Sequence, residues 1–131
     1  MATPIDLKTL SNGLDEIPPE NLIELAEDKA RAFKADRLKT NQLRNFYSAV
    51  LQIRQEFEVS KKFTPKIKTM LVLLKPKLAF AAGRQLAVRK NFKPFMDSAI
   101  EGVINATNQT EGLENYLALI ESVVAYHKFY E

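Results

Sequence analysis

Residues 40–57 read TNQLRNFYSAVLQIRQEF, and this segment carries the clearest helical pattern of the chain. Its hydrophobic side chains follow one another at intervals of three, one, three, three and four residues: Leu43, Phe46, Tyr47, Val50, Ile53 and Phe57. Because an α-helix has about 3.6 residues per turn, these intervals place all of them on one face. The segment therefore predicts an amphipathic helix that starts with a cap at Thr40.

Other segments show the same kind of pattern, each with a residue that favours the start of a helix. Residues 20–34 carry hydrophobic side chains at helical intervals and acidic residues in the first turns, where the helix dipole favours them. Thr64 is an N-cap candidate followed by Pro65, which is the strongest start signal in the chain. Asn91 is expected to cap a further helix, and Asn108 forms a predicted capping box with the glutamate three residues later.

Proline and glycine are expected to interrupt these helices. Pro76 stands inside the pattern that starts at Pro65, and its ring clashes with the carbonyl four residues earlier, so we expect a kink there. Gly83, next to Arg84, is expected to allow another helix or backbone to approach closely. Residues 1–19 show no sustained period and hold three prolines and a glycine, which predicts irregular structure.

No segment alternates with period two over a useful length, so a β-rich fold is excluded. The chain of 131 residues has the length of one domain, and 46% hydrophobic with 27% charged residues is the composition of a globular protein. We therefore expect an all-α fold, a single compact bundle of about five helices with one kinked at Pro76. The predicted organisation is an irregular N-terminal arm over residues 1–19 and a single helical domain over residues 20–131.

Catalytic and metal-binding patterns are missing from the sequence. The chain has no cysteine, which excludes disulfides, thiolate metal sites and cysteine nucleophiles and fits a reducing cytoplasm. The one histidine, His127, lies next to the hydrophobic stripe of the last helical segment, where a hydrogen-bonded structural role is expected. No glycine-rich phosphate loop and no nucleophile motif occurs. We therefore expect no enzymatic activity, no metal and no cofactor.

The longest hydrophobic runs, residues 70–74 and 78–82, are far shorter than the roughly 20 residues that cross a bilayer. The first residues have no basic region followed by a hydrophobic one, so a secretory signal is not expected. Both observations favour a cytoplasmic protein without a membrane partner.

Charge is distributed unevenly along the chain. Residues 59–96 contain ten lysines and arginines and no acidic residue, whereas residues 1–30 carry seven acids against two bases and residues 97–131 six acids against one lysine. A long acid-free segment on rigid helices suits the binding of a polyanion through its phosphates. The alternative is that the acidic ends fold over the basic segment and neutralise it.

Within the basic segment, charged residues recur at helical spacing. Lys68 and Lys75 are seven residues apart, as are Lys77 and Arg84, so the members of each pair are expected to share a helix face. These two pairs are therefore candidates for phosphate contacts.

Further basic residues lie outside these two pairs. On the helix predicted over residues 40–57, Arg44 and Arg54 stand off the hydrophobic stripe. Other basic residues gather near the ends of the predicted helices: Arg31, Lys34, Arg37, Lys39, Lys61, Lys62, Arg89, Lys90 and Lys93. Because the phenylalanines of the stripes are expected in the core, we expect contacts to the nucleic-acid backbone without sequence specificity, and no stacking on bases.

Three segments stand out together in their order and spacing: residues 40–47 (TNQLRNFY), 74–84 (LKPKLAFAAGR) and 123–130 (VVAYHKFY). With them, the chain from residue 38 onward resembles the small subunit of the type III-A CRISPR–Cas effector, the Csm complex. The resemblance implies an all-helical protein without enzymatic activity, of which several copies stack beside the subunits that hold the guide RNA.

The resemblance also implies which residues contact RNA. Its implied partners are the guide RNA and the target RNA, other Csm subunits and further copies of the chain itself, with no small-molecule substrate. The RNA-binding candidates at the matching positions are Arg44, Lys75, Lys77 and Arg84, followed by Lys68 and Arg54. The kink at Pro76 is expected to expose Lys75 and Lys77 at a bend.

Two other functions fit the same charge pattern: a helical scaffold whose basic face meets an acidic protein partner, and a small DNA-binding regulator. A scaffold would show no salt-dependent affinity for nucleic acid, and a regulator would prefer a specific DNA duplex. Leu73, Phe80 and Phe129 exceed the needs of one core and are compatible with a homodimer, so the sequence leaves the oligomeric state open.

Overall fold

The structure is a computed structural model that describes residues 6–131, and every regular element in this range is helical. In chain order the elements are α1 (Leu7–Asn12), the 3-10 turn η1 (Leu14–Glu16), α2 (Pro19–Ala35), α3 (Thr40–Ser60), α4 (Pro65–Val72), α5 (Leu74–Arg84), the π-helical turn η2 (Val88–Phe92), α6 (Lys93–Ile104) and α7 (Gln109–Phe129). The predicted all-α fold is confirmed. Within residues 6–131, no helix combines the length and the hydrophobicity needed to span a membrane.

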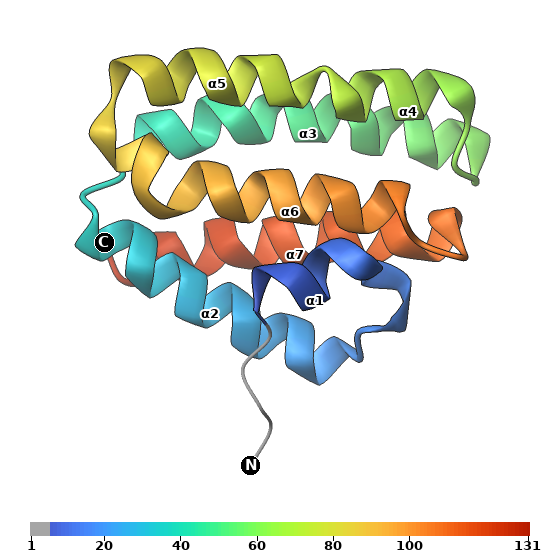
Figure 1. Ribbon diagram of the computed structural model, residues 1–131, viewed down its shortest axis with the longest axis horizontal. Coiled ribbons are helices and arrows are strands. Elements are labelled where there is room, and N and C mark those ends of the chain that lie inside the picture. Colours follow the sequence, from blue (N-terminus) through green and yellow to red (C-terminus); the bar gives the residue numbers. More distant parts are fainter. Residues whose placement is uncertain (1–5) are drawn as a thin grey trace.

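The helices form a single bundle whose layers can be followed in Figure 1. α4 and α5 follow each other along the upper edge with α3 beside them, α6 and α7 run through the middle, and α1 and α2 cover the lower side. α7 packs against α2, α3 and α6, and α6 also contacts α1, α4 and α5. The central pair α6 and α7 thus joins the upper and lower layers into the predicted compact bundle.

Aromatic side chains from four elements meet in the core. Phe33 of α2 packs edge-on against Phe92 of η2, with 5.2 Å between the ring centroids, and lies 5.7 Å from Phe95 of α6. Phe92 also makes an edge-to-face contact with Phe46 of α3 at 5.4 Å. All four rings are at most 5% exposed, so the predicted hydrophobic stripes do face the core.

Two predicted helix starts are confirmed. At the start of α4, Thr64 Oγ1 accepts a hydrogen bond from the Ile67 N–H at 3.2 Å. At the start of α7, Asn108 Oδ1 accepts one from the Glu111 N–H at 3.0 Å. The Asn108 N–H donates to Asp15 Oδ2 at 2.9 Å, so a tertiary contact takes the place of the second half of the predicted capping box.

Two other predicted caps are wrong. The N-cap of α3 is Lys39, whose N–H donates to Gln42 Oε1 at 2.8 Å, and Thr40 is the first helical residue. Asn91 lies inside η2 in a run that stays helical, and its side chain donates to Asp36 Oδ2 at 2.6 Å. The Thr40 hydroxyl likewise donates to a side chain far away in the sequence, Glu131, so neither Thr40 nor Asn91 caps its own helix.

The kink predicted at Pro76 takes the form of a break between α4 and α5 at Leu73, three residues earlier. In an unbroken helix the proline ring would clash with the carbonyl of Val72, which accounts for the place of the break. α5 then runs regularly through Pro76, so the expectation that a bend at the proline exposes Lys75 and Lys77 is wrong.

The described part of the predicted N-terminal arm is more regular than expected. Asp6 caps α1 by accepting a hydrogen bond from the Thr9 N–H at 2.7 Å, and the side chain and backbone of Thr9 together hold the pKa of Asp6 below its usual value. Leu10 and Leu14 are fully buried, in elements that pack on α6 and α7. A helix of six residues is too short to show a period in the sequence. Residues 1–5 of the arm lie outside the described residues, and the boundary before residue 20 stays a prediction.

The close packing predicted at Gly83 occurs at Gly102 instead. A Cβ atom at Gly83 would meet no described atom within 4 Å, so that expectation is wrong. A Cβ atom at Gly102 would collide with the carbonyl oxygen of Leu10 and lie 3.0 Å from Leu14 Cγ. Glycine is needed on α6 here because α1 rests directly on its backbone.

Candidate nucleic-acid interface

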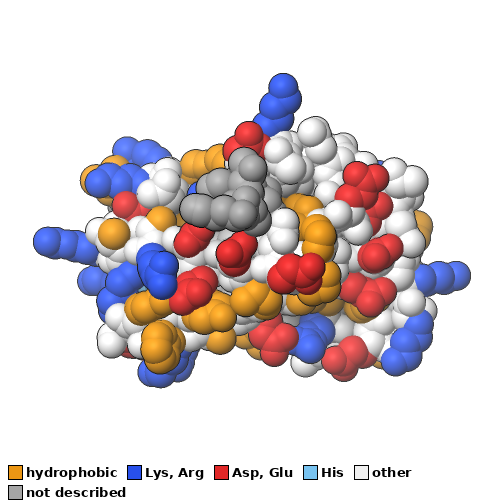
Figure 2. Space-filling view, turned by 90° about the horizontal axis from the view of Figure 1, so that it is seen from below, with side chains coloured by type: hydrophobic (Ala, Val, Ile, Leu, Met, Phe, Trp, Pro, Cys, Tyr) orange, Lys and Arg blue, Asp and Glu red, His pale blue; other side chains and the backbone are white. Residues whose placement is uncertain are grey.

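The acid-free segment contributes α4 and α5 to the upper layer of the bundle and continues through η2 into the start of α6. Three of its ten basic residues pair with acids elsewhere in the described chain: Lys66 with Glu56, Lys75 with Glu101 and Lys93 with Asp97. Figure 2 shows acidic side chains spread over the opposite, lower face, with most lysines and arginines at its edges. That face includes α2, where Glu20, Glu24 and Asp28 are exposed. The acidic ends therefore neutralise the basic segment only in part.

A groove of about 370 Å³ lies between α3 and α5 and reaches η2. Leu78, Val88 and Phe92 line it with side chains that are only 2% exposed. Gln42 and Gln85 also line it, and the Gln42 Nε2–H donates to Gln85 Oε1. None of the residues that line this groove is acidic.

Two of the predicted RNA-contacting residues lie in this groove. Lys77 and Arg84 both line it and are exposed, as their shared helix face predicts. Neither makes an ion pair within residues 6–131. Between them Phe80 is 68% exposed, and the central guanidinium carbon of Arg84 lies 5.6 Å from its ring centroid. This cation–π contact positions the guanidinium beside the ring.

Arg44 and Lys68 are exposed cations outside the groove. Arg44 stands on α3, about 100° around the helix from the groove residue Asn45, and Lys68 stands on α4 before the break at Leu73. Neither is ion-paired within the part of the chain that the structure describes. Both are free to meet a phosphate, but the structure does not bring them together with Lys77 and Arg84.

The other two predicted RNA-contacting residues are held by carboxylates. Arg54 Nη1 lies 3.1 Å from Glu121 Oε2 of α7, and this hydrogen bond raises the pKa of the guanidinium above its usual value. Lys75 Nζ pairs with Glu101 of α6. A phosphate would have to compete with these carboxylates, so Arg54 and Lys75 are weaker candidates than the four unpaired residues.

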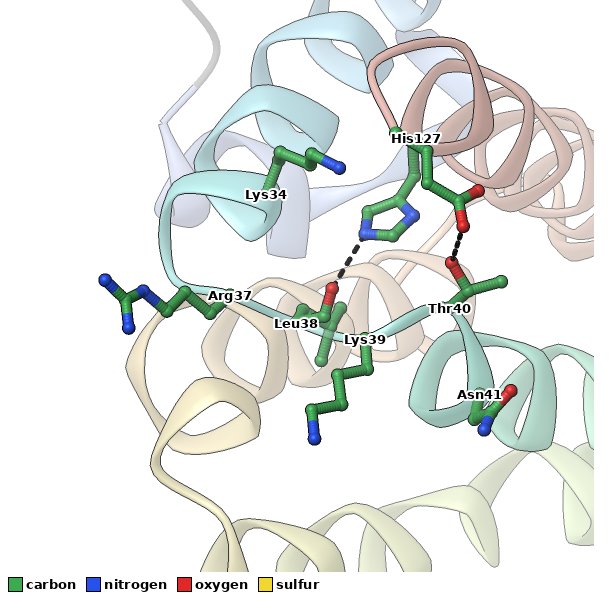
Figure 3. A pocket seen from close by; sticks show the side chains of 8 residues that line it. Lys34, Arg37, Leu38, Lys39, Thr40, Asn41 and His127 are labelled. Carbon is green, nitrogen blue, oxygen red and sulfur yellow. Dashed lines mark hydrogen bonds between the residues drawn. The ribbon is translucent and has the colours of Figure 1, made fainter.

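A second basic depression lies where the α2–α3 loop meets the end of α7. It is lined by Lys34, Arg37 and Lys39, and also by Glu131. Figure 3 shows that the Arg37 and Lys39 side chains point outward in different directions. Glu131 also places a carboxylate here, so the three cations do not form one phosphate site.

His127 lines the same depression. It is 2% exposed, and its Nε2 lies 3.0 Å from the carbonyl oxygen of Leu38 (Figure 3). Within residues 6–131, no group of three or more histidine, aspartate or glutamate side chains is placed to hold a metal ion. The contact of His127 ties the α2–α3 loop to α7, which is a structural role.

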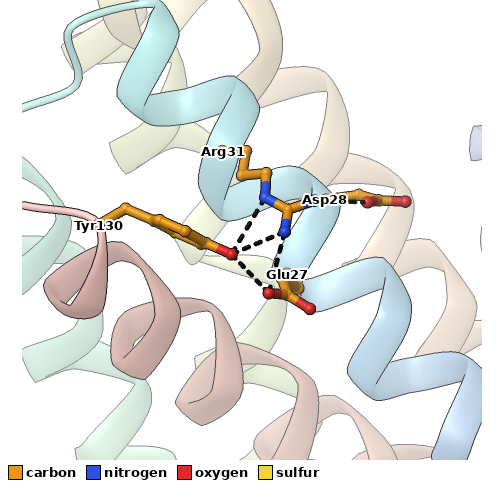
Figure 4. Close-up of polar contacts among 4 residues, drawn as sticks. All are labelled: Glu27, Asp28, Arg31 and Tyr130. Carbon is orange, nitrogen blue, oxygen red and sulfur yellow. Dashed lines mark hydrogen bonds and ion pairs between the residues drawn. The ribbon is translucent and has the colours of Figure 1, made fainter.

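The guanidinium of Arg31, near the end of α2, is part of a cluster of polar side chains (Figure 4). It donates to the Tyr130 hydroxyl at 2.8 Å and pairs with Glu27 at 3.2 Å. The Tyr130 hydroxyl in turn donates to Glu27, which raises the pKa of the phenol. This cluster anchors the end of α7 on α2 and leaves Arg31 unsuited to binding phosphate.

Sequence reasoning missed the aromatic and amide parts of the groove. Phe80 was expected only as a surplus hydrophobic position, and Gln42, Asn45 and Gln85 carried no signal at all. Phe80 lies three residues after Lys77 and four before Arg84, so its place between two cations was readable from helical spacing. Gln42 and Asn45 lie on α3 and Gln85 follows the end of α5, so only the fold brings these carboxamides together.

Comparisons with known proteins point to one family. The family model described as Csm2 Type III-A matches residues 16–131, which is nearly the whole chain. Searches of the curated proteins and of the solved structures found no match. The matched range includes every element from α2 to α7, and therefore all the residues that line the groove.

Proposed function

The chain belongs to the Csm2 family of small subunits of the type III-A CRISPR–Cas complex, and we propose that it binds the guide and target RNA of that complex through phosphate contacts. Membership makes it a structural small subunit that associates with other Csm subunits. In the proposed function it has no catalytic activity, helps to assemble the complex and meets further copies of itself.

The observation that carries the proposal is the pair Lys77 and Arg84. Both are exposed, make no ion pair within residues 6–131 and lie on one face of α5, in a groove whose described lining residues include no acid. Fixed cations without nearby acids attract the phosphates of any RNA sequence. Arg44 on α3 and Lys68 on α4 add exposed charge outside the groove, without an ion pair among the described residues. Such contacts are weak singly and gain strength when several subunits line one duplex.

Binding of the purified chain to labelled single-stranded RNA, duplex RNA and duplex DNA over a series of salt concentrations tests the proposal. We expect RNA binding that does not depend on sequence and falls steeply with salt. Arg84→Gln should weaken binding by a similar factor on unrelated sequences and reduce the slope of log K against log salt by about 0.7.

Arg54→Gln is the matched control because it removes the same charge from a guanidinium already engaged by Glu121. It should change RNA affinity less than Arg84→Gln does. Absence of salt-dependent affinity for any nucleic acid would favour an acidic protein partner, and preference for one DNA duplex would favour a DNA-binding regulator. Either result would overturn the proposal.

A further inference from the structure

The groove between α3 and α5 has a chemistry that phosphate binding does not need. Phosphate contacts require only cations, yet the groove combines buried hydrocarbon, an exposed aromatic ring and several carboxamides. Its volume of about 370 Å³ falls in the range of small-molecule sites. A phosphate alone would leave the hydrophobic part of this space unused.

The aromatic part is Phe80, on the outer side of α5. Its ring is 68% exposed although phenylalanine is usually buried, and it stands at the groove beside Leu78 and Ala81. Every nucleobase has a π-face that stacks on such a ring. Phe80 therefore offers the part of its ring that the Arg84 guanidinium does not cover as a platform for a base that has left its own stack.

The polar part consists of Gln42 and Asn45 of α3 and Gln85 between α5 and η2. A carboxamide both donates and accepts hydrogen bonds, as the edge of a nucleobase does. Gln42 and Gln85 bond each other across the groove and can exchange that bond for bonds to a base edge.

Lys77 and Arg84 complete the site from either side of Phe80. We propose that the groove holds one unpaired nucleotide of an RNA strand, with its base stacked on Phe80, its edge at the carboxamides and its flanking phosphates at Lys77 and Arg84. The inference rests on the proposed RNA binding and extends it from the phosphate backbone to a base. It replaces the expectation from sequence that no base is stacked.

The test compares two short single strands of equal length, an RNA strand and the same strand without bases, by fluorescence anisotropy at low salt. Wild-type protein should bind the strand with bases about fivefold or more tightly. Phe80→Ala should weaken binding of the strand with bases by a clearly larger factor than binding of the abasic strand, because the base loses its stacking partner whereas the abasic strand loses at most the positioning of Arg84. Phe129→Ala is the matched control, because Phe129 is 77% exposed on α7 and does not line the groove.

Equal binding of both strands by wild-type protein would overturn the inference and leave the phosphate proposal standing. The inference would also be overturned if Phe80→Ala weakened the binding of both strands by the same factor. The same holds if the substitution changed only the self-association of the protein, measured by sedimentation. Failure of the wild-type protein to bind either strand at low salt would overturn the proposed function together with the inference. Thermal unfolding of both variants verifies that they are folded.

Discussion

Tyr116 of α7 is fully buried, and its hydroxyl has no hydrogen-bond partner within residues 6–131. Burial raises the pKa of this phenol, so the ring stays neutral and keeps an unpaired O–H among hydrocarbon. We expect Tyr116→Phe to raise the free energy of unfolding by about 1 kcal/mol, because it removes that polar atom and keeps the packing of the ring. Denaturant unfolding followed by circular dichroism measures the change.

Tyr130→Phe is the matched control, since the hydroxyl of Tyr130 is paired. It donates to Glu27 and accepts from Arg31, and its removal should lower the free energy of unfolding. A loss of stability in Tyr116→Phe comparable to that of the control would contradict the first prediction.

The hydrogen bond between Thr40 and the carboxylate of Glu131 can be tested through the pKa of Glu131. Its carboxylate accepts a hydrogen bond from Thr40 Oγ1 at 2.9 Å and pairs with Lys128 at 3.3 Å, and these contacts lower its pKa from 4.5. We expect Thr40→Val to raise that pKa toward 4.5 in an NMR titration of the side-chain carboxyl carbon. An unchanged pKa would show that the hydrogen bond does not form.

The sign of the pH effect follows from the lowered pKa of Glu131. Because the folded-state pKa lies below that of the unfolded chain, the stabilising contribution is complete above pH 4.5. It disappears as the pH falls through the folded-state pKa of Glu131. In the Thr40→Val protein, this acid-dependent loss should be smaller.

At the level of elements, the crossing of α1 over α6 depends on one glycine. Since a Cβ atom at Gly102 would collide with the carbonyl oxygen of Leu10, Gly102→Ala must push α1 away or distort α6. We expect it to lower the free energy of unfolding by about 1–3 kcal/mol, the usual cost of overpacking a core. Thermal and denaturant unfolding measure the effect, and faster amide exchange in α1 would locate it.

Gly83→Ala is the opposite case within α5. A Cβ atom there meets no described neighbour, and the backbone φ of Gly83 is not positive. Alanine should therefore raise the free energy of unfolding by about 0.5–1 kcal/mol, because it restricts the unfolded chain and favours helix. Destabilisation by Gly83→Ala would mean that this face of α5 is already covered by a neighbour.

These elements also show what the sequence could predict. Helical periodicity is local, so it located the helices of residues 20–131 and the cap at Thr64. The caps expected at Thr40 and Asn91 failed because their polar groups bond to Glu131 and Asp36, which lie far away in the sequence. Helix α1 was missed because packing on α6, not a repeating pattern, stabilises it.

At the scale of the whole molecule, the sequence predicted how charge is distributed along the chain, but not which lysines and arginines form ion pairs. Arg54 and Lys75 look as free as Arg84 in the sequence, yet Glu121 and Glu101 reach them from α7 and α6. Which cations are free for a ligand depends on tertiary neighbours that helical spacing does not report.

Because basic residues lie on both sides of the bundle, two substitutions can show whether RNA binds at one face or responds only to the net charge of the protein. Lys68 lies on α4 in the upper layer and Lys8 on α1 in the lower one, both exposed and without an ion pair in the described residues. Lys68→Gln and Lys8→Gln change the net charge equally, but interactions are screened beyond about 8 Å at physiological salt. We expect Lys68→Gln to reduce the slope of log K against log salt for single-stranded RNA by about 0.7, and Lys8→Gln to leave it unchanged. Equal effects of the two substitutions would mean that RNA responds to the total charge of the molecule, and the upper layer would then not be the binding face.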